Sequence, residues 1–374
     1  MIVNVVIYAQ RSDFMQAFDA KFLPLQEGDL DVTTFMDELI DANTQLEVYK
    51  CKLNASKLNQ AWFLPTLQKK EALASSLLEG TQATLDGVLV DQTNPNEKDK
   101  DMFEVRNYVN AAHQGYVYLR NNSFTIDFIK ELHKTLMEGN VRRNKKTIPG
   151  EFRTEQNYLG RKKMISYIPP VAENVDSLMK NLIEYINDPQ DKLRPLVRTA
   201  IIHAQFETIH PFMDGNGRVG RIIIPLCLYK YNQISLPCFF VSEALERDKF
   251  KYYNLLNGIR TKNDWGSWIA FFLKTVAQQC KKYIDIIDQI NELYENDLEL
   301  AKTIIKSNKV VDLINLLYTY PIITANIVTQ KTDIPPATAT RYLNALAEAE
   351  ILYMDSNKLR NKTFYYYDLL NVLR

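Results

Sequence analysis

The stretch ETIHPFMDGNGRVGR, from Glu207 to Arg221, holds more reactive side chains than any other window of this chain. It places a histidine, two carboxylates and two arginines around a Gly-Asn-Gly turn, in a chain with only 12 glycines among 374 residues. An apolar, helix-like run through Ile201 and Phe206 precedes the turn, and the run VGRIIIPLCLYKY follows it. The pattern predicts two helices joined by a short turn, with His210 where the first helix ends.

The turn and the start of the second helix form a predicted anion site. Backbone N–H groups of a glycine turn and of a helix N-terminus can point into one concavity, which favours a phosphate. Arg218 and Arg221 are three residues apart on the second helix, so both can reach the same side. Asn216 can orient a phosphate oxygen through its amide. The sequence therefore predicts a cradle for a nucleotide polyphosphate.

Two further side chains give this cradle chemistry. Asp214 supplies a hard carboxylate oxygen, which suits Mg²⁺ when phosphates and water provide its other ligands. His210, with an ordinary imidazole pKa of about 6.5, can accept a proton from an incoming hydroxyl near neutral pH. These groups predict in-line attack of a hydroxyl on a bound phosphorus, with pyrophosphate leaving if the innermost phosphorus reacts.

Each of these features also has an ordinary structural explanation when it is taken alone. A Gly-Asn-Gly sequence often makes a simple turn between helices. A single histidine is usually a hydrogen-bonded structural residue, and two arginines three apart usually form a solvated helix face. The co-occurrence of base, carboxylate, anion loop and two cations within twelve residues favours phosphate chemistry over these alternatives.

The segment HPFMDGNGRVGR resembles the signature of the Fic family, HxFx(D/E)GNGRxxR, and it matches every specified position. The resemblance covers about residues 100 to 275 and implies a mainly α fold, with a helical core and one β-hairpin flap. It implies transfer of AMP from ATP to a Ser, Thr or Tyr hydroxyl of a target protein, with Mg²⁺. The resemblance implies that His210 is the base and Asp214 the metal ligand. It also implies that Gly215, Asn216 and Gly217 form the phosphate-binding loop, and that Arg218 and Arg221 face the β and γ phosphates.

The segment PGEFRTEQNYLGRKKMISYIPP, from Pro149 to Pro170, is predicted to form the hairpin, with Gly160 between two short extended runs. The resemblance places this flap over the nucleotide, where it registers the target as an added strand. It implies contacts with the nucleotide from the residues Asn157, Tyr158, Leu159 and Gly160. It also places a tyrosine pair, Tyr252 and Tyr253, near the adenine, although two core aromatics would explain that pair equally well.

The segment EALASSLLEG places Ser75 and Glu79 four residues apart, on one face of a helix. Taken alone, it reads as an amphipathic helix with an exposed acid. It also resembles the inhibitory motif of the Fic family, (S/T)xxxE(G/N), which Gly80 completes. The resemblance implies that Glu79 pairs with Arg221 and so removes the guanidinium that would fix the γ-phosphate. In some relatives the same glutamate orients water for AMP removal, and the sequence leaves this second activity open.

Composition limits the classes of protein that the chain can belong to. Hydrophobic residues make up 46% and charged residues 24%, and Lys+Arg and Asp+Glu balance at 45 each, so no global field favours nucleic acid. The four cysteines show neither a CxxC pair nor metal-ligand spacing. The opening MIVNVVIYA is too short for a membrane span and a poor signal peptide. We expect a cytoplasmic protein without a membrane segment, and a homo-oligomer is an open alternative.

The pattern of the chain suggests three regions: an N-terminal helical region carrying the inhibitory helix (1–100), the catalytic core (101–300) and a C-terminal winged helix (301–374). In the last region, helices are predicted at Lys309–Tyr318, over ITANIVTQKT and after Pro335, followed by two strands. This region has a net charge of only +1, from seven basic and six acidic residues, which gives weak support for DNA binding. Protein docking is at least as consistent with that charge. A DNA-binding regulator with a nucleotide-sensing core is the alternative function.

Overall fold

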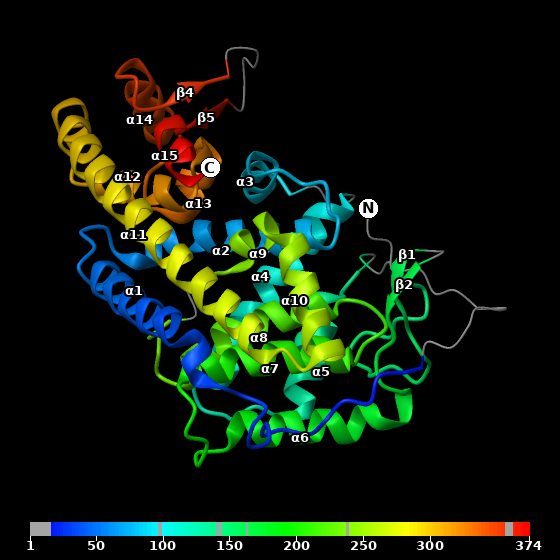
Figure 1. Cartoon of the computed structure of the whole chain (residues 1–374). Coiled ribbons are helices and arrows are strands. Elements are labelled where there is room, and N and C mark those ends of the chain that lie inside the picture. Colours follow the sequence, from blue (N-terminus) through cyan, green and yellow to red (C-terminus); the bar gives the residue numbers. More distant parts are fainter. Residues whose placement is uncertain are drawn as a thin grey trace. The chain divides into compact units, whose positions relative to one another are not determined.

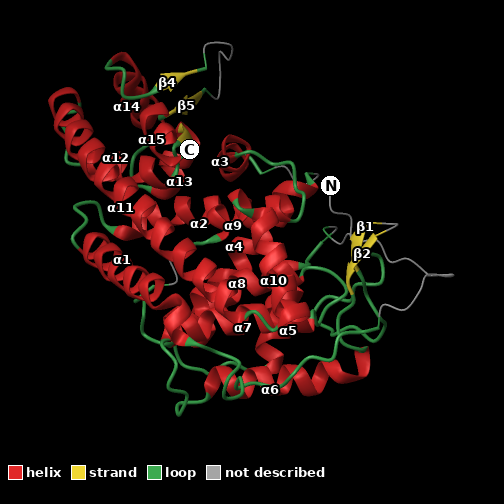
Figure 2. Ribbon diagram, in the orientation of Figure 1, coloured by secondary structure: helices red, strands yellow, loops and turns green. Residues whose placement is uncertain are grey.

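The computed structural model describes residues 16–95, 99–139, 141, 144–161, 164–236, 239–355 and 362–374 (Figure 1). The opening segment MIVNVVIYA lies outside the described residues, as do Lys358 and Arg360, which follow the first of the two strands predicted near the C-terminus. The described chain is mostly helical, as the sequence predicted, and Figure 2 shows its strands gathered in small sheets. No helix in these ranges is both long enough and apolar enough to cross a membrane.

The chain divides into two compact units, each made of several segments of the sequence. Unit 1 comprises Met1–Leu46, Ala74–Gln82 and Phe103–Gln279. Unit 2 comprises Glu47–Leu73, Ala83–Met102 and Cys280–Arg374. The three-region division predicted from the sequence is a different partition, and it stays a prediction.

The helices of unit 1 surround the predicted site. They comprise the first part of α1 (Met36–Asn54), the end of α2 (Gln60–Leu78), most of α4 (Lys100–Leu119), α5 (Ile126–Leu136), α6 (Val175–Asn187), α7 (Pro195–Ile209), α8 (Asn216–Lys230), α9 (Ser242–Arg247), α10 (Lys249–Lys262) and the first part of α11 (Trp265–Ile304). Two 3-10 turns, Val32–Phe35 and Ala172–Asn174, precede α1 and α6. Helix α7 is at the centre, because every residue from Leu196 to Ile209 is buried. A helix that is buried on all sides belongs in a core, and α6, α8 and α10 pack around α7.

The hairpin of unit 1 consists of β1 (Leu159–Arg161) and β2 (Met164–Tyr167), which pair antiparallel. The sequence placed Gly160 between the two strands, and this placement is wrong. Gly160 lies within β1, at an irregularity in the register, and has a φ of 134°. That backbone conformation suits glycine because it has no side chain to clash. Gly160 therefore permits a bulge in the strand.

Unit 2 contains the helices and strands predicted near the C-terminus, together with two elements that the sequence analysis missed. Its elements are the end of α1, most of α2, α3 (Leu85–Thr93), the first residues of α4, the end of α11, α12 (Val310–Thr319), β3 (Ile322–Thr324), α13 (Ala325–Lys331), α14 (Pro336–Glu348), β4 (Tyr353–Met354), β5 (Thr363–Tyr365) and α15 (Tyr367–Leu373). The strands form an antiparallel sheet in the order β3-β5-β4. Strand β3 and helix α15 were not predicted, because each is short and follows a longer apolar pattern.

Helix α2 begins at Gln60 and contains Pro65 in its second turn. Asn59 provides the start signal, because its Oδ1 accepts a hydrogen bond from the Ala61 N–H at 2.9 Å. The polar cap therefore decides where α2 begins, and the proline is tolerated inside it.

Candidate active site

His210 lies directly after α7, where the helix ends in a left-handed residue. Its φ and ψ are 51° and 59°, and Pro211 follows, so the helix cannot continue. The imidazole is buried, and its Nδ1 has no hydrogen-bond partner among the described residues. Burial, with the nearby charges of Arg153 and Arg260, lowers the pKa of His210 from 6.5 to about 3. The ring is therefore neutral at physiological pH, which is the form a general base requires.

The turn after His210 is held by the amide of Asn216. Its Oδ1 accepts the Phe212 N–H at 2.8 Å, and its Nδ2 donates to the Phe212 carbonyl at 2.8 Å. Asn216 and Gly217 already belong to the first turn of α8, and Gly215, with a φ of 82°, is the residue before it. The Asn216 side chain thus closes the loop rather than facing outward, which differs from the phosphate contact expected from the sequence.

Both predicted arginines are buried, which excludes the solvated helix face as an explanation. Arg218 is 0% exposed, and its Nε and Nη1 atoms have no hydrogen-bond partner among the described residues. Glu104 and Asp214 lie 3.7 and 3.8 Å from its guanidinium, beyond hydrogen-bonding distance. A buried guanidinium with N–H groups left over fits an anionic ligand, because such groups are costly to leave unpaired.

Arg221 differs from Arg218, since Ser75 and Glu79 accept hydrogen bonds from its Nε and Nη2. Its Nη2 donates to Glu79 Oε1 at 2.7 Å and to the Ser75 carbonyl at 2.9 Å, while its Nε donates to Ser75 Oγ at 2.8 Å. Burial alone would lower the pKa of Arg221, but Glu79 and other nearby groups raise it above its ordinary value. The contact between Glu79 and Arg221 implied by the sequence is therefore present.

Glu79 also lies against the first turn of α8. A β-carbon added to Gly217 would be 2.2 Å from Glu79 Oε1 and 2.8 Å from Arg221 Nη1. The Glu79 carboxylate thus lies beside Gly217, one of the residues predicted to form the phosphate-binding loop. Gly80, with a φ of 96°, follows as the left-handed residue after α2. The motif therefore brings Ser75 and Glu79 to Arg221, and Gly80 ends the helix that carries them.

The tyrosine pair lies beside the same arginine. Tyr252 is 0% exposed, and its hydroxyl donates to His203 Nε2 at 2.9 Å, while His203 Nδ1 donates to the Gly220 carbonyl at 3.1 Å. Burial raises the pKa of both Tyr252 and Tyr253, and Arg221 and Glu79 are close enough to act on each electrostatically. Both phenols therefore stay protonated and belong to the surroundings of Arg221.

Two buried residues of this site were not predicted. His133, on α5, is neutral and bridges the motif: its Nε2 donates to the Asp214 carbonyl at 3.0 Å, and its Nδ1 accepts the Gly150 N–H at 2.9 Å. Glu207, on α7, has a buried Oε1 without a partner among the described residues, and burial raises its pKa to about 7. Glu207 lies within the quoted stretch, three residues before His210, whereas no local signal identifies His133.

The flap residues divide between two locations. Asn157 is buried before β1, and its Nδ2 donates to the Phe212 carbonyl at 3.0 Å. Tyr158, Leu159 and Gly160 are half-buried at the hairpin itself. Asn157 therefore supports the loop after His210, and the other three belong to the flap.

Asp214 is the single carboxylate at the predicted metal position. Its Oδ1 accepts the Gly215 N–H at 2.7 Å, and its Oδ2 accepts the Asn144 N–H at 3.3 Å. The described residues contain no group of three or more His, Cys, Asp or Glu side chains that could hold a metal ion. One carboxylate beside an anion site suits a metal that takes most of its ligands from phosphate and water, which is how Mg²⁺ is usually held.

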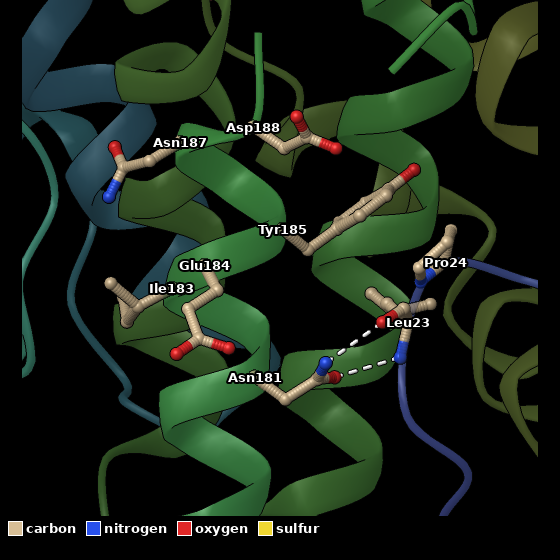
Figure 3. Close-up of a pocket in the computed structure, with 8 residues that line it drawn as sticks. All are labelled: Leu23, Pro24, Asn181, Ile183, Glu184, Tyr185, Asn187 and Asp188. Atoms are coloured by element: carbon tan, nitrogen blue, oxygen red, sulfur yellow. Dashed lines mark hydrogen bonds between the residues drawn. The ribbon is translucent and has the colours of Figure 1, made fainter. Parts of the chain in front are cut away.

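A separate pocket of about 540 Å³ lies in unit 1, between the N-terminal segment and α6 (Figure 3). Asn181 fixes the segment there, since its side chain accepts the Leu23 N–H and donates to the Leu23 carbonyl, both at 2.8 Å. None of the residues lining this pocket belongs to the predicted site. The candidate active site is instead defined by the buried groups around the start of α8.

Comparison with known families identifies the class of protein that this site defines. The Fic/DOC family model matches residues 123–228, and the Fic/DOC family N-terminal model matches residues 36–117, together about half of the chain. The chain belongs to the Fic/DOC family. The matched core contains α7, the loop and the start of α8.

Individual relatives agree with this assignment. The chain is 26% identical over 242 residues to "Protein adenylyltransferase Fic" of Drosophila willistoni, covering 63% of this chain and 43% of the relative. It is 27% identical over 238 residues to the protein of the same name in Drosophila erecta, covering 62% and 43%. It thus spans less than half the length of these relatives. A solved Fic family protein from Desulfovibrio desulfuricans G20 shares the fold, with a TM-score of 0.57 and 20% identity over 90% of this chain and 97% of that one.

Proposed function

We propose that this protein transfers AMP from ATP to a Ser, Thr or Tyr hydroxyl of a target protein. The observation that carries the proposal is that one motif contains a neutral, buried His210 and a buried Arg218 whose Nε and Nη1 have no hydrogen-bond partner among the described residues. A base and an anion-binding guanidinium flank the start of α8, whose N–H groups favour phosphate. The names of the relatives support the same chemistry.

In this proposal each group has one task. His210 accepts the proton of the attacking hydroxyl as the oxygen bonds to the α-phosphorus, and pyrophosphate leaves. Arg218 neutralises charge on the β-phosphate, and Asp214 would hold Mg²⁺, which would neutralise further phosphate charge. Tyr252 and Tyr253 line the adenine side.

We further propose that the end of α2 inhibits this reaction. Glu79 occupies Arg221 at 2.7 Å and lies against Gly217, at the position proposed for the γ-phosphate. While this contact persists, ATP lacks the guanidinium that would fix its terminal phosphate. A contact worth about 1 to 3 kcal/mol changes the competent population by about 5- to 150-fold.

A labelling experiment tests the transfer. The Glu79→Gly variant is incubated with Mg²⁺ and ATP labelled at either the α- or the γ-phosphate, alone and in a cell lysate. Relative to the same mixture without the protein, we expect added labelling from α-labelled ATP, no added labelling from γ-labelled ATP, and loss of the added labelling when His210→Ala is combined with the first change. The exposed His113 provides a matched control, since His113→Ala should leave labelling unchanged. Labelling that survives His210→Ala would refute the proposal.

The other predictions stay proposals. Helix α14 presents Arg341 as its single basic residue, and no observation favours DNA over a protein as the partner of the C-terminal region. Self-association and a cytoplasmic location are also proposals. So is the division of the chain into regions 1–100, 101–300 and 301–374.

A further inference from the structure

The backbone that carries His210 is held from outside its own helix. Six consecutive carbonyl oxygens, from Glu207 to Phe212, each accept a hydrogen bond from a group beyond α7. The last carbonyls of a helix have no partners within it, and water or a cap usually serves them. Here nearly all the donors come from α10, from the segment before β1 and from the end of β2.

Arg153, in the segment before β1, provides three of these contacts. Its Nε donates to the His210 carbonyl at 3.0 Å, its Nη2 to the Ile209 carbonyl at 3.4 Å, and its backbone N–H to the Pro211 carbonyl at 2.9 Å. The same Nη2 donates to the carbonyl of Pro170, on the far side of the hairpin. Arg153 therefore joins both ends of the flap to the residue that carries the base.

Tyr167 and Arg260 hold the preceding turn. The Tyr167 hydroxyl, at the end of β2, donates to the Thr208 carbonyl at 2.7 Å. Arg260, on α10, donates from Nη2 to the Glu207 carbonyl at 3.0 Å, and its guanidinium carbon lies 3.8 Å from the centre of the Tyr167 ring. The two side chains thus support each other while each fixes one carbonyl.

We propose that Arg153, Tyr167 and Arg260 are positioning residues that fix the direction of the His210 ring through its backbone. The inference rests on the proposed function of His210 as the base. A left-handed conformation is costly for a residue other than glycine and persists where its surroundings enforce it. Since the imidazole Nδ1 has no hydrogen-bond partner among the described residues, the direction of the ring depends largely on the backbone that carries it. The backbone around His210 is therefore linked by hydrogen bonds to the residues at the two ends of the hairpin.

Tyr167→Phe is the sharpest test, because it removes one hydrogen bond and no charge. Tyr231→Phe is a matched control: the Tyr231 hydroxyl donates to the Ile186 carbonyl at the end of α6 at 3.0 Å, and Arg198 lies over its ring. Both changes are made in the Glu79→Gly protein, and self-labelling with α-labelled ATP is followed. A displacement of about 1 Å costs about 100-fold in rate. We expect Tyr167→Phe to lower kcat by about 10- to 100-fold with KM for ATP within about twofold, and Tyr231→Phe to leave both within about twofold.

A second readout does not need turnover. The chain has only 4 histidines, so ring-labelled histidine gives an NMR spectrum in which His210→Ala assigns one signal. We expect Tyr167→Phe to move the His210 signal and Tyr231→Phe to leave it in place. An unmoved signal, or an equal loss of kcat in both variants, would overturn the inference. A protein that transfers no AMP but shows the shift would refute the proposed function and leave the positioning role supported.

Discussion

Replacing Glu79 with glutamine should make the protein less stable and a better binder of ATP at the same time. The change keeps the shape of the side chain and removes its charge. Arg221 is 1% exposed, so it loses its ionic partner where water cannot replace it. Removing one member of a buried pair costs about 3 to 5 kcal/mol. Glu79 is 22% exposed and Ser75 keeps its two contacts, so we expect about 2 kcal/mol here.

This cost should appear as a lower melting temperature without nucleotide. For a unit of this size, 1 kcal/mol corresponds to about 2 to 4 °C, so the variant should melt about 4 to 8 °C below the wild type. With ATP and Mg²⁺ the γ-phosphate replaces the carboxylate beside Arg221. If the Kd falls tenfold, ATP at one saturating concentration stabilises the variant by about 1.4 kcal/mol more than the wild type, and most of the gap closes.

Thermal unfolding with and without ATP·Mg²⁺, followed by circular dichroism, measures both effects. Glu155→Gln is the control, because Glu155 pairs with Lys146 at the surface, where an ion pair contributes little. It should melt and respond to ATP like the wild type. The reasoning is refuted if Glu79→Gln is as stable as the wild type without ATP, or if ATP raises the two melting temperatures equally.

Three other expectations follow from the buried groups. The pKa of Glu207 is about 7 in the folded protein against an ordinary 4.5, so its contribution to stability is complete below pH 4.5 and is lost as the pH rises through 7. Urea unfolding should show that the free energy of unfolding falls by about 3 kcal/mol over this range, and Glu207→Gln should lack this fall. Because the pKa of His210 is about 3, kcat/KM for transfer should not fall between pH 8 and about pH 5, and a decline centred near the ordinary 6.5 would contradict this. Gly215→Ala should cost about 1 to 2 kcal/mol in chemical unfolding, since Gly215 has a φ of 82° and a β-carbon would lie 3.0 Å from Met137 Sδ; unchanged stability would show that the turn adapts.

The sequence was informative where the chemistry is local. The helices on both sides of the turn, the position of His210 and the spacing of Ser75 and Glu79 all follow from periodicity and from a compact motif. His133 could not be found in this way, because its role depends on contacts with Asp214, which is 81 residues away. Helix periodicity also gave no sign that both arginines are buried, since burial depends on how α2, α4 and α8 pack.

The unequal surroundings of the two arginines explain how inhibition can act without closing the site. Arg221 has its donors occupied by Ser75 and Glu79, whereas Arg218 keeps donors without partners in the described residues. A ligand favours the state in which it makes more contacts. A nucleotide can contact Arg218 whether or not Glu79 is bound to Arg221, but it can contact Arg221 only when Glu79 has moved away. In this arrangement ATP binds the inhibited protein without a contact between its γ-phosphate and Arg221. The free energy of that contact, when it forms, favours the displacement of Glu79. A diphosphate, which lacks that group, should therefore bind wild type and Glu79→Gln with nearly equal affinity, and a large difference in calorimetric Kd for ADP would show that Glu79 blocks more than the γ position.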